Sequence, residues 1–147
     1  MLPVDLKLFP EIEINNIKFF SKSNYHVSLV NLCDYSEAQQ EKIFEYAQIF
    51  TRDYPIKIKE LTHTFRLVTE NDQRSIIVLV EMSGLNQLIS SINKHFDYEF
   101  AYPPTHITLY TPKGQFGIGI DTQERYQQLT QVIDSQKTKK LINSFLK

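Results

Sequence analysis

The chain has 147 residues, of which 41% are hydrophobic and 22% are charged, proportions typical of one soluble globular domain. This length is sufficient for one hydrophobic core, and we treat residues 1–147 as a single domain. Because the net charge is only −1, no global basic field attracts nucleic acid, and we do not expect a long duplex as a partner.

The cysteine content and the first residues bear on the compartment. A single cysteine, Cys33, excludes an internal disulfide and a thiolate metal cluster, and we interpret it as a small packing residue. The opening residues, MLPVDLKLFPEIE, lack the basic flank and continuous apolar stretch of a signal peptide. No apolar run approaches membrane-spanning length. We therefore expect a reduced, cytoplasmic protein without a membrane partner, located in the host cytoplasm if it is viral.

The first part of the chain predicts two strands and a helix. Residues 17–20 (IKFF) form a strand-like run, and polar and apolar side chains alternate in residues 25–32 (YHVSLVNL). A helix should begin after Ser36, because Gln39 completes a capping box, and it should end before Pro55. Its expected apolar stripe consists of Ile43, Phe44, Ala47 and Phe50.

The middle of the chain predicts a strand pair. Residues 56–69 and 75–82 are strand-like and are joined by the polar turn ENDQR. The first strand loses its alternation near Glu60 and Leu61, which indicates a bulge. The second strand is apolar on both faces, as expected in the middle of a sheet.

The second half repeats the order of helix and strand. A helix should follow Gly84, and residues 105–111 (THITLYT) predict a strand in which His106, Thr108 and Tyr110 share one face. Residues 114–120 (GQFGIGI) predict a turn and a short strand. The helix after Gly84 has the apolar stripe Leu85, Leu88, Ile89, Ile92 and Phe96. Two C-terminal helices are also expected. The first begins at about Thr122 and has the apolar residues Tyr126, Leu129, Val132 and Ile133, and the second has Leu141, Ile142, Phe145 and Leu146.

Two of the four histidines occur in the same four-residue phrase. H-V-S-L begins at His26 and H-I-T-L begins at His106, 80 residues later. A spacing of two on a strand places His26 with Ser28, and His106 with Thr108, on one face at about 6–7 Å. The matched positions of the phrases in the two halves predict two lobes that face each other across a cleft.

This constellation suits chemistry at a phosphodiester. One imidazole can take the proton of the attacking oxygen while the opposite imidazole protonates the leaving oxygen, and the two hydroxyls can donate to the non-bridging oxygens. Such a mechanism requires no metal and no cofactor. A structural role for each histidine, as a partly buried strand residue bonded to a neighbour, is the alternative. The repetition of the whole phrase in both halves favours the active site.

The two phrases resemble the paired H-x-[S/T]-apolar motifs of the 2H phosphoesterase superfamily, which includes the 2′-5′ RNA ligase-like proteins and cyclic nucleotide phosphodiesterases. The resemblance covers about residues 17–111. It implies an α+β, bilobal fold with two antiparallel sheets around a central cleft and helices outside. It also implies metal-independent cleavage of 2′,3′-cyclic, 2′-5′-linked or related nucleotides, with His26, Ser28, His106 and Thr108 as the catalytic set.

This sequence departs from the superfamily pattern at both ends. Members usually have an additional strand and helix before the first motif, whereas 25 residues precede His26, and the segment after the second motif is unusually long. We hypothesise that residues 116–120 (FGIGI) or the C-terminal helices take the missing place.

Several further residues near the motifs are candidates for substrate binding. An aromatic ring beside the cleft could stack on a base, although each ring could equally belong to the core. Lys113 could neutralise a phosphate, or it could be an ordinary turn lysine. The remaining histidines, His63 and His95, lack the hydroxyl two positions on, and we interpret them as structural or surface residues. The aromatic candidates are Tyr110, Phe20, Tyr25, Tyr102 and Phe116.

Three functions remain open from the sequence. The first is the cleavage of a small nucleotide phosphodiester, including the destruction of a cyclic or 2′-5′ oligonucleotide immune signal, as viral members of the superfamily do. The second is the processing of an RNA end by 2′,3′-cyclic phosphate hydrolysis or 2′-5′ ligation. The third is a non-catalytic module that binds a nucleotide. The sequence does not indicate an oligomeric state.

Overall fold

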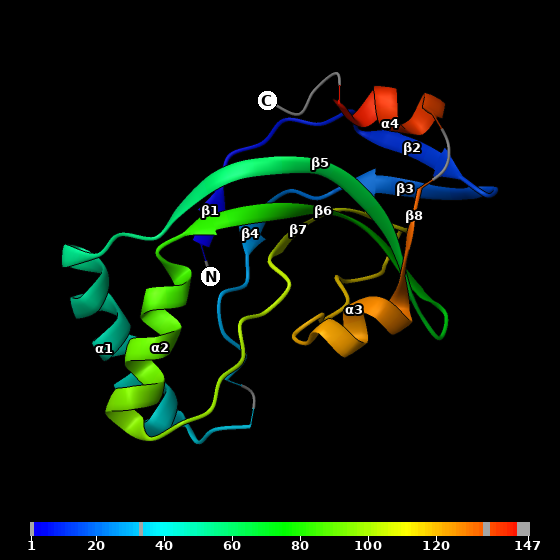
Figure 1. Cartoon of the computed structure of the whole chain (residues 1–147). Coiled ribbons are helices and arrows are strands. Elements are labelled where there is room, and N and C mark those ends of the chain that lie inside the picture. The colour runs from blue at the N-terminus through cyan, green and yellow to red at the C-terminus, as the bar shows by residue number, and fades with distance from the viewer. Residues whose placement is uncertain (1, 33, 134–135, 144–147) are drawn as a thin grey trace.

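The structure is a computed structural model that describes residues 2–32, 34–133 and 136–143. These residues form an α+β fold (Figure 1). The strands are β1 (Leu2–Val4), β2 (Glu11–Ile14), β3 (Ile17–Ser21), β4 (Tyr25–Val27), β5 (Lys57–Glu70), β6 (Gln73–Ser83), β7 (His106–Thr111) and β8 (Thr130–Val132). The helices are α1 (Glu37–Asp53), α2 (Leu85–Phe96), α3 (Gln123–Leu129) and α4 (Gln136–Asn143).

The strands of the described residues form one antiparallel sheet of eight strands. Its order is β1-β4-β7-β6-β5-β8, and the β2–β3 hairpin joins it through the pairing of β3 with β7. The sequence pattern predicts two lobes with one motif each, and the resemblance to the 2H superfamily implies two sheets. The described residues form one sheet because the two motif strands, β4 and β7, pair directly with each other. The mixed α+β class is confirmed.

The first two helices follow the local signals in the sequence. Ser36 caps α1: its Oγ accepts the N–H of Gln39 at 3.2 Å, and Gln39 Oε1 accepts the N–H of Ser36 at 3.0 Å. The helix ends at Asp53, ahead of Pro55, as predicted. In its stripe, Ile43 is buried but Phe44 is 61% exposed, because successive helix residues are about 100° apart around the axis. The predicted stripe of α2 is buried at Leu85, Leu88, Ile89 and Ile92.

The long hairpin of β5 and β6 is also confirmed. Its register shifts between Ile58 and Glu60 and again between Leu61 and Phe65, so the predicted irregularity lies where the alternation fails. Strand β6 lies between β7 and β5 and is buried on both faces, as its continuous apolar run predicts.

The ends of the chain differ from the prediction. Strands β1 and β2 are not predicted, and residues 115–121 contain no strand. Helix α3 ends at Leu129, and the next residues form β8, which pairs with β5, instead of continuing the helix through Val132 and Ile133. Helix α4 contains Ile142, whereas Phe145 and Leu146 of the predicted stripe lie outside the described residues, as does Cys33.

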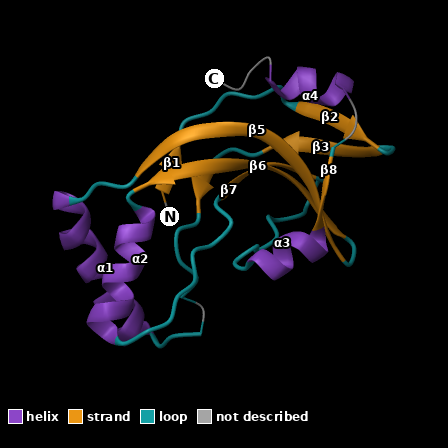
Figure 2. Ribbon diagram, in the orientation of Figure 1, coloured by secondary structure: helices purple, strands orange, loops and turns teal. Residues whose placement is uncertain are grey.

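The helices lie at different places around the sheet (Figure 2). Helices α1 and α2 pack against each other beyond one end of the sheet, α3 packs on β5 and β8, and α4 lies over β2. The largest core cluster lies on one face of the sheet, and a smaller one, containing Ile77, Ile118 and Ile120, lies on the other face. Among the described residues, no helix combines the length and apolar character needed to cross a membrane.

Candidate active site

The two histidine phrases lie side by side on the central strands. Val27 of β4 pairs with Ile107 of β7, and both side chains are fully buried on the core face. Because neighbouring strand residues alternate between faces, the histidine and the hydroxyl of each phrase project from the opposite face of the sheet. The expected grouping of the four polar side chains is therefore achieved by two neighbouring strands.

The register also determines which side chains oppose each other. In an antiparallel pair, moving one residue forward on one strand matches one residue back on the other. Extending the pair Val27–Ile107 by one residue in each direction sets His26 opposite Thr108 and Ser28, which follows the end of β4, opposite His106. Each imidazole lies across from the hydroxyl of the other phrase, so the arrangement has an approximate twofold relation.

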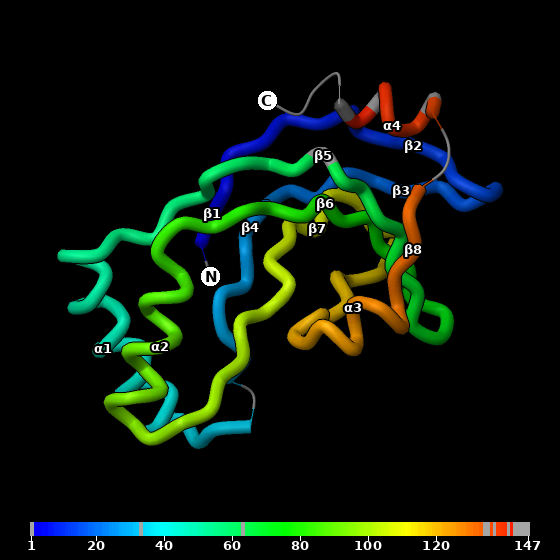
Figure 3. Tube along the Cα trace, viewed as in Figure 1, coloured from blue at the N-terminus to red at the C-terminus, as the bar shows by residue number. Residues whose placement is uncertain are grey.

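These four side chains line a cleft with a volume of about 960 Å³. Three segments form its walls. The first wall is residues 22–32 with Asp34 and Tyr35, and it contains β4. The second wall is residues 99–108, which lead into β7, and the third is residues 117–125. Figure 3 shows the chain leaving β4 and the chain approaching β7 running alongside each other below the sheet. The cleft is thus built from segments that lie far apart in the sequence.

The surroundings of the two imidazoles favour their neutral forms. Burial lowers the pKa of His106, and the nearby His26 lowers it further, against the opposing effect of a hydrogen bond to Pro104. The pKa of His26 is lowered first by burial and then by the positive charge of Lys22. His106 Nδ1 lies 2.9 Å from the carbonyl oxygen of Pro104 and must donate to it, which leaves Nε2 to exchange protons with a ligand.

The hydroxyl of Thr108 is packed against the third wall. A Cβ added at Gly117 would lie 3.4 Å from Thr108 Oγ1 and 3.6 Å from Cγ2. The absence of a side chain at Gly117 therefore lets the third wall approach the second motif closely. Ser28 lies one residue beyond the end of β4 and is exposed to the cleft.

Tyr110 does not share the face of His106 and Thr108, contrary to the prediction. Thr108 pairs with Ile77 and Tyr110 pairs with Ile76, so Leu109 is an extra residue in β7. Such a bulge breaks the alternation and turns the next side chain away from its expected face. The Tyr110 ring is fully buried in the main core, where its hydroxyl donates to the carbonyl of Phe9 at 2.9 Å.

The other predicted substrate-binding residues also lie away from the cleft lining. Tyr25 is buried on the core face beside Val27, and Phe20 lies on β3, where it pairs with Thr111. Tyr102, Lys113 and Phe116 are exposed but are not lining residues, and Phe116 is 82% exposed. The reason is local: residues that neighbour a lining residue in the chain point elsewhere when the backbone alternates or turns.

Of the two other histidines, the structure describes the side chain of His95 only. His95 is exposed on α2, and its ring stacks on Tyr46 at 4.4 Å between centroids, in agreement with a structural or surface role. The side chain of His63 lies outside the described part of the structure.

The cleft contains side chains that the sequence analysis does not single out. Lys22 is brought there because its N–H donates to the carbonyl of Leu109 on β7, at 3.2 Å. The two aromatic residues, Tyr35 and Phe100, lie in loops next to the motifs, one after the first motif and one before the second, and this position is the signal that could have identified them. The missed lining residues with polar or aromatic side chains include Lys22, Asn24, Asn31, Tyr35, Phe100, Asp121 and Arg125.

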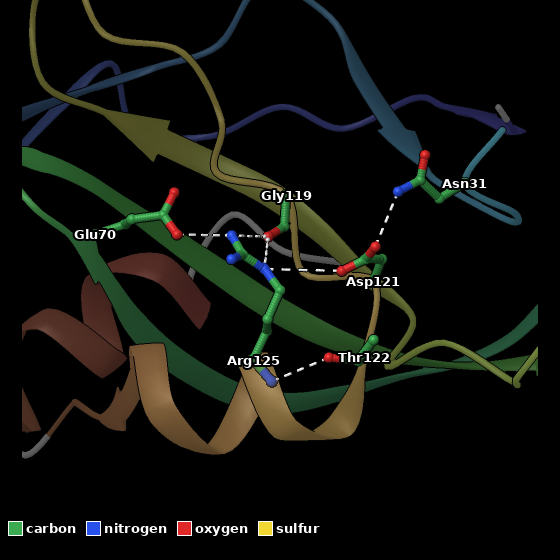
Figure 4. A network of polar contacts seen from close by, with 6 residues as sticks. All are labelled: Asn31, Glu70, Gly119, Asp121, Thr122 and Arg125. Carbon is green, nitrogen blue, oxygen red and sulfur yellow. Dashed lines mark hydrogen bonds and ion pairs between the residues drawn. The ribbon is translucent and has the colours of Figure 1, made fainter. Parts of the chain in front are cut away.

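The third wall is held by a network around Arg125 (Figure 4). The guanidinium of Arg125 binds Glu70 of β5 at 2.8 Å and donates to the carbonyl of Gly119 at 2.9 and 3.0 Å. It also lies 3.7 Å from Asp121, which accepts a hydrogen bond from Asn31 Nδ2 at 2.9 Å. Asn31 belongs to the first wall, so this hydrogen bond connects the first and third walls.

Comparison with known proteins assigns no family. No family model, curated protein or solved structure matches this chain. The resemblance to the 2H superfamily is therefore limited to the two H-x-[S/T]-apolar phrases, and function is inferred from the residues of the cleft.

Proposed function

We propose that the protein is a metal-independent phosphodiesterase that cleaves a small nucleotide phosphodiester by paired-histidine acid–base catalysis. The substrate class is a 2′,3′-cyclic, 2′-5′-linked or cyclic oligonucleotide. One observation carries the proposal: two histidine–hydroxyl pairs from phrases 80 residues apart line the same cleft, each histidine opposite the other phrase's hydroxyl. Structural histidines need no such reciprocal arrangement.

The chemistry follows from this symmetry. One imidazole, in its neutral form, takes a proton from water as the water oxygen bonds to phosphorus. The other imidazole, in its protonated form, gives its proton to the leaving ribose oxygen as that P–O bond breaks. The hydroxyls of Ser28 and Thr108 donate to the non-bridging oxygens, where negative charge accumulates. After each turnover the imidazoles have exchanged protonation states, and proton exchange with solvent restores them.

Two further features of the cleft support a phosphodiester substrate. The charge of Lys22 acts on His26, and the same charge attracts a phosphate to the reacting position. A bound anion in turn favours the protonated form of one imidazole, and this offsets the lowering of the histidine pKa values in the protein without ligand.

The size of the cleft favours a small ligand. Ligand sites of small molecules have volumes of roughly 300–1,000 Å³, and the volume of about 960 Å³ is at the upper end of this range. A small nucleotide or an RNA end fits such a site better than a long RNA, which needs many phosphate contacts along a basic track.

Membership of the 2H superfamily is part of the same proposal. Strands β4 and β7 divide the sheet into one arm with β1 and another with β6, β5 and β8. We take these arms as the counterparts of the two lobes, with one motif at the inner edge of each. The destruction of an oligonucleotide immune signal is the role we propose to test alongside RNA-end processing.

A product assay tests the activity. Purified protein is incubated with a chelator and a panel of 2′,3′-cyclic mononucleotides, 2′-5′ and 3′-5′ dinucleotides, and cyclic di- and trinucleotides. We expect cleavage of at least one class, and the preferred class distinguishes signal destruction from RNA processing. Replacing His26 or His106 by alanine should each reduce turnover by about 10²- to 10⁴-fold, the usual contribution of a general acid or base.

His95→Ala is the matched control, because this histidine is exposed and lies outside the cleft lining. It should retain turnover. Full activity in both His26→Ala and His106→Ala would contradict the proposal. Failure of the folded protein to cleave any member of the panel would favour the nucleotide-binding module instead.

A further inference from the structure

The end of the cleft nearest the helices carries two aromatic rings. Tyr35 and Phe100 both line the cleft, with ring centroids 5.3 Å apart and planes inclined at 50°. Tyr98, which is not a lining residue, contacts both rings, at 5.0 and 5.6 Å between centroids. Cleft-lining rings that are supported by another ring provide a platform on which a planar ring can stack.

The backbone at each of the two cleft-lining rings is held by an amide side chain from a helix. Gln40 of α1 donates from Nε2 to the carbonyls of Leu32 and Tyr35, both at 2.9 Å. Asn93 of α2 donates from Nδ2 to the carbonyl of Phe100 at 2.9 Å and accepts the Phe100 N–H at 2.8 Å. A backbone that is fixed in this way restricts where its side chain can lie, which reduces the entropy lost when a ligand binds.

Two carboxylates line the same end of the cleft. Asp34 precedes Tyr35 in the chain and Glu99 precedes Phe100, and both are exposed lining residues. Neither carboxylate forms an ion pair with any residue in the described part of the chain. Negative charge at this end repels a phosphate, whereas Lys22 attracts one to the histidines. The charges therefore orient a nucleotide with its base on the rings and its phosphate at the motifs.

We propose that Tyr35 and Phe100, with Asp34 and Glu99, form a nucleobase subsite that selects guanine. This inference rests on the proposed function, since it places the base of the same substrate. A carboxylate accepts hydrogen bonds and cannot donate them when ionised. Guanine presents two adjacent donors, N1–H and N2–H, on its pairing edge, and these match the two oxygens of one carboxylate. The corresponding edges of adenine, cytosine and uracil place an acceptor beside each donor, which a carboxylate repels.

Initial rates on the four 2′,3′-cyclic mononucleotides test the selection. We expect the highest kcat/KM for the guanine nucleotide. Asp34→Asn or Glu99→Gln should reduce the guanine-to-adenine ratio of kcat/KM by about fivefold to 150-fold, the range of a two-bond base contact of about 1–3 kcal/mol. The variant with the larger effect identifies the reading carboxylate. An unchanged ratio in both variants would overturn the proposal.

The platform is tested separately. Tyr35→Leu and Phe100→Leu should raise KM for all four nucleotides by about fivefold to 150-fold, because one base–aromatic stack contributes about 1–3 kcal/mol. Phe100→Tyr, which keeps a ring, should retain the wild-type KM, and this separates lost stacking from lost folding. Phe116→Leu is the matched control, since that ring is exposed and is not a lining residue. Equal KM values in the leucine variants and the control would refute the platform.

A binding measurement separates this inference from the catalytic proposal. Calorimetry with GMP and AMP is performed on the double variant His26→Ala, His106→Ala, which requires no turnover. Tighter binding of GMP that is lost on Asp34→Asn or Glu99→Gln would support the subsite even if no substrate is cleaved. Cleavage without any preference for guanine, in rate or in binding, would leave the enzyme proposal intact and overturn the subsite.

Discussion

The two imidazoles work in surroundings that favour loss of their protons. Burial lowers the pKa of both, and Lys22 adds to the effect at His26, so both pKa values lie below the ordinary value of 6.5. Acid–base catalysis needs one neutral and one protonated imidazole. The pH profile of kcat/KM should therefore be bell-shaped with its maximum on the acid side of 6.5, and activity should fall with rising pH as the general acid loses its proton.

Replacing Lys22 by glutamine tests this electrostatic origin. Loss of the positive charge should raise the pKa of His26. The limb of the kcat/KM profile that reflects the titration of His26 should then move to higher pH. The shift should shrink at high salt, because Lys22 is only half-buried and salt screens its charge. The measurement is kcat/KM against pH for the wild type and the variant at two ionic strengths.

Lys113→Gln is the control for Lys22→Gln, since Lys113 is exposed outside the cleft lining. Its profile should coincide with that of the wild type. Identical profiles for both variants would show that Lys22 does not act on His26, and a rate independent of pH between about 5 and 8 would contradict paired-histidine catalysis altogether.

At the scale of single residues, the sequence predicts the motif but not the binding residues around it. His26 with Ser28, and His106 with Thr108, share a face because a spacing of two is a local property of any strand. Tyr110 is different, because the bulge at Leu109 depends on how β7 pairs with β6. A side chain whose direction depends on a partner strand cannot be placed from its own neighbours in sequence.

Gly84 joins β6 to α2 and shows how one residue determines the position of an element. It adopts φ of 88°, in the left-handed region that favours glycine, and a Cβ there would lie 2.6 Å from the carbonyl oxygen of Pro55. Gly84→Ala should therefore reduce the free energy of unfolding by about 1–3 kcal/mol, the usual cost of a strained backbone position. Urea unfolding followed by circular dichroism measures this change.

Gly119→Ala is the matched control, because a Cβ at Gly119 meets no atom within 4 Å. We expect it to change the free energy of unfolding by less than about 0.5 kcal/mol, as for most surface substitutions. Equal stabilities of the two variants would mean that the backbone near Gly84 relaxes without cost.

Long elements are predictable here, whereas three of the short strands are not; β4 is also short, but the alternation that predicts it continues in the sequence to residue 32. Helices α1 and α2 and the β5–β6 hairpin carry caps, periodic stripes and a turn within their own sequence. Strands β1, β2 and β8 have three or four residues each, which is too short for a period to be recognised. Strand β8 follows a helical pattern, and its pairing with β5 overrides that pattern.

At the scale of the whole molecule, the cleft is a product of chain topology. The sequence predicts that the two motifs meet, because they are matched in type and in position. It does not predict that they meet as neighbouring strands, or that residues 117–125 return to form the third wall. Both features depend on contacts between segments that are separated in the sequence, such as the pairing of β4 with β7 and the binding of Arg125 to Glu70, 55 residues earlier, and the pattern within each segment contains no signal for them.

The hydrogen bond between Asn31 and Asp121 is expected to hold the first and third walls of the cleft together. We call this pair the clasp; it joins the first and third walls and is anchored to β5 through Arg125 and Glu70. Asn31→Asp places a like charge opposite Asp121 and should open the clasp. An exposed hydrogen bond contributes about 1 kcal/mol, so amide hydrogen exchange in residues 117–122 should become about fivefold faster.

Asn31→Lys provides the matched comparison, because a lysine attracts Asp121 where an aspartate repels it. Exchange in residues 117–122 should then stay near the wild-type rate, and the difference between the two variants should diminish at high salt. If the aspartate and lysine variants exchange equally fast, the clasp does not hold the walls together. If only the aspartate variant is accelerated, the contact between the first and third walls is under electrostatic control from a pair of residues that take no part in the proposed proton transfers.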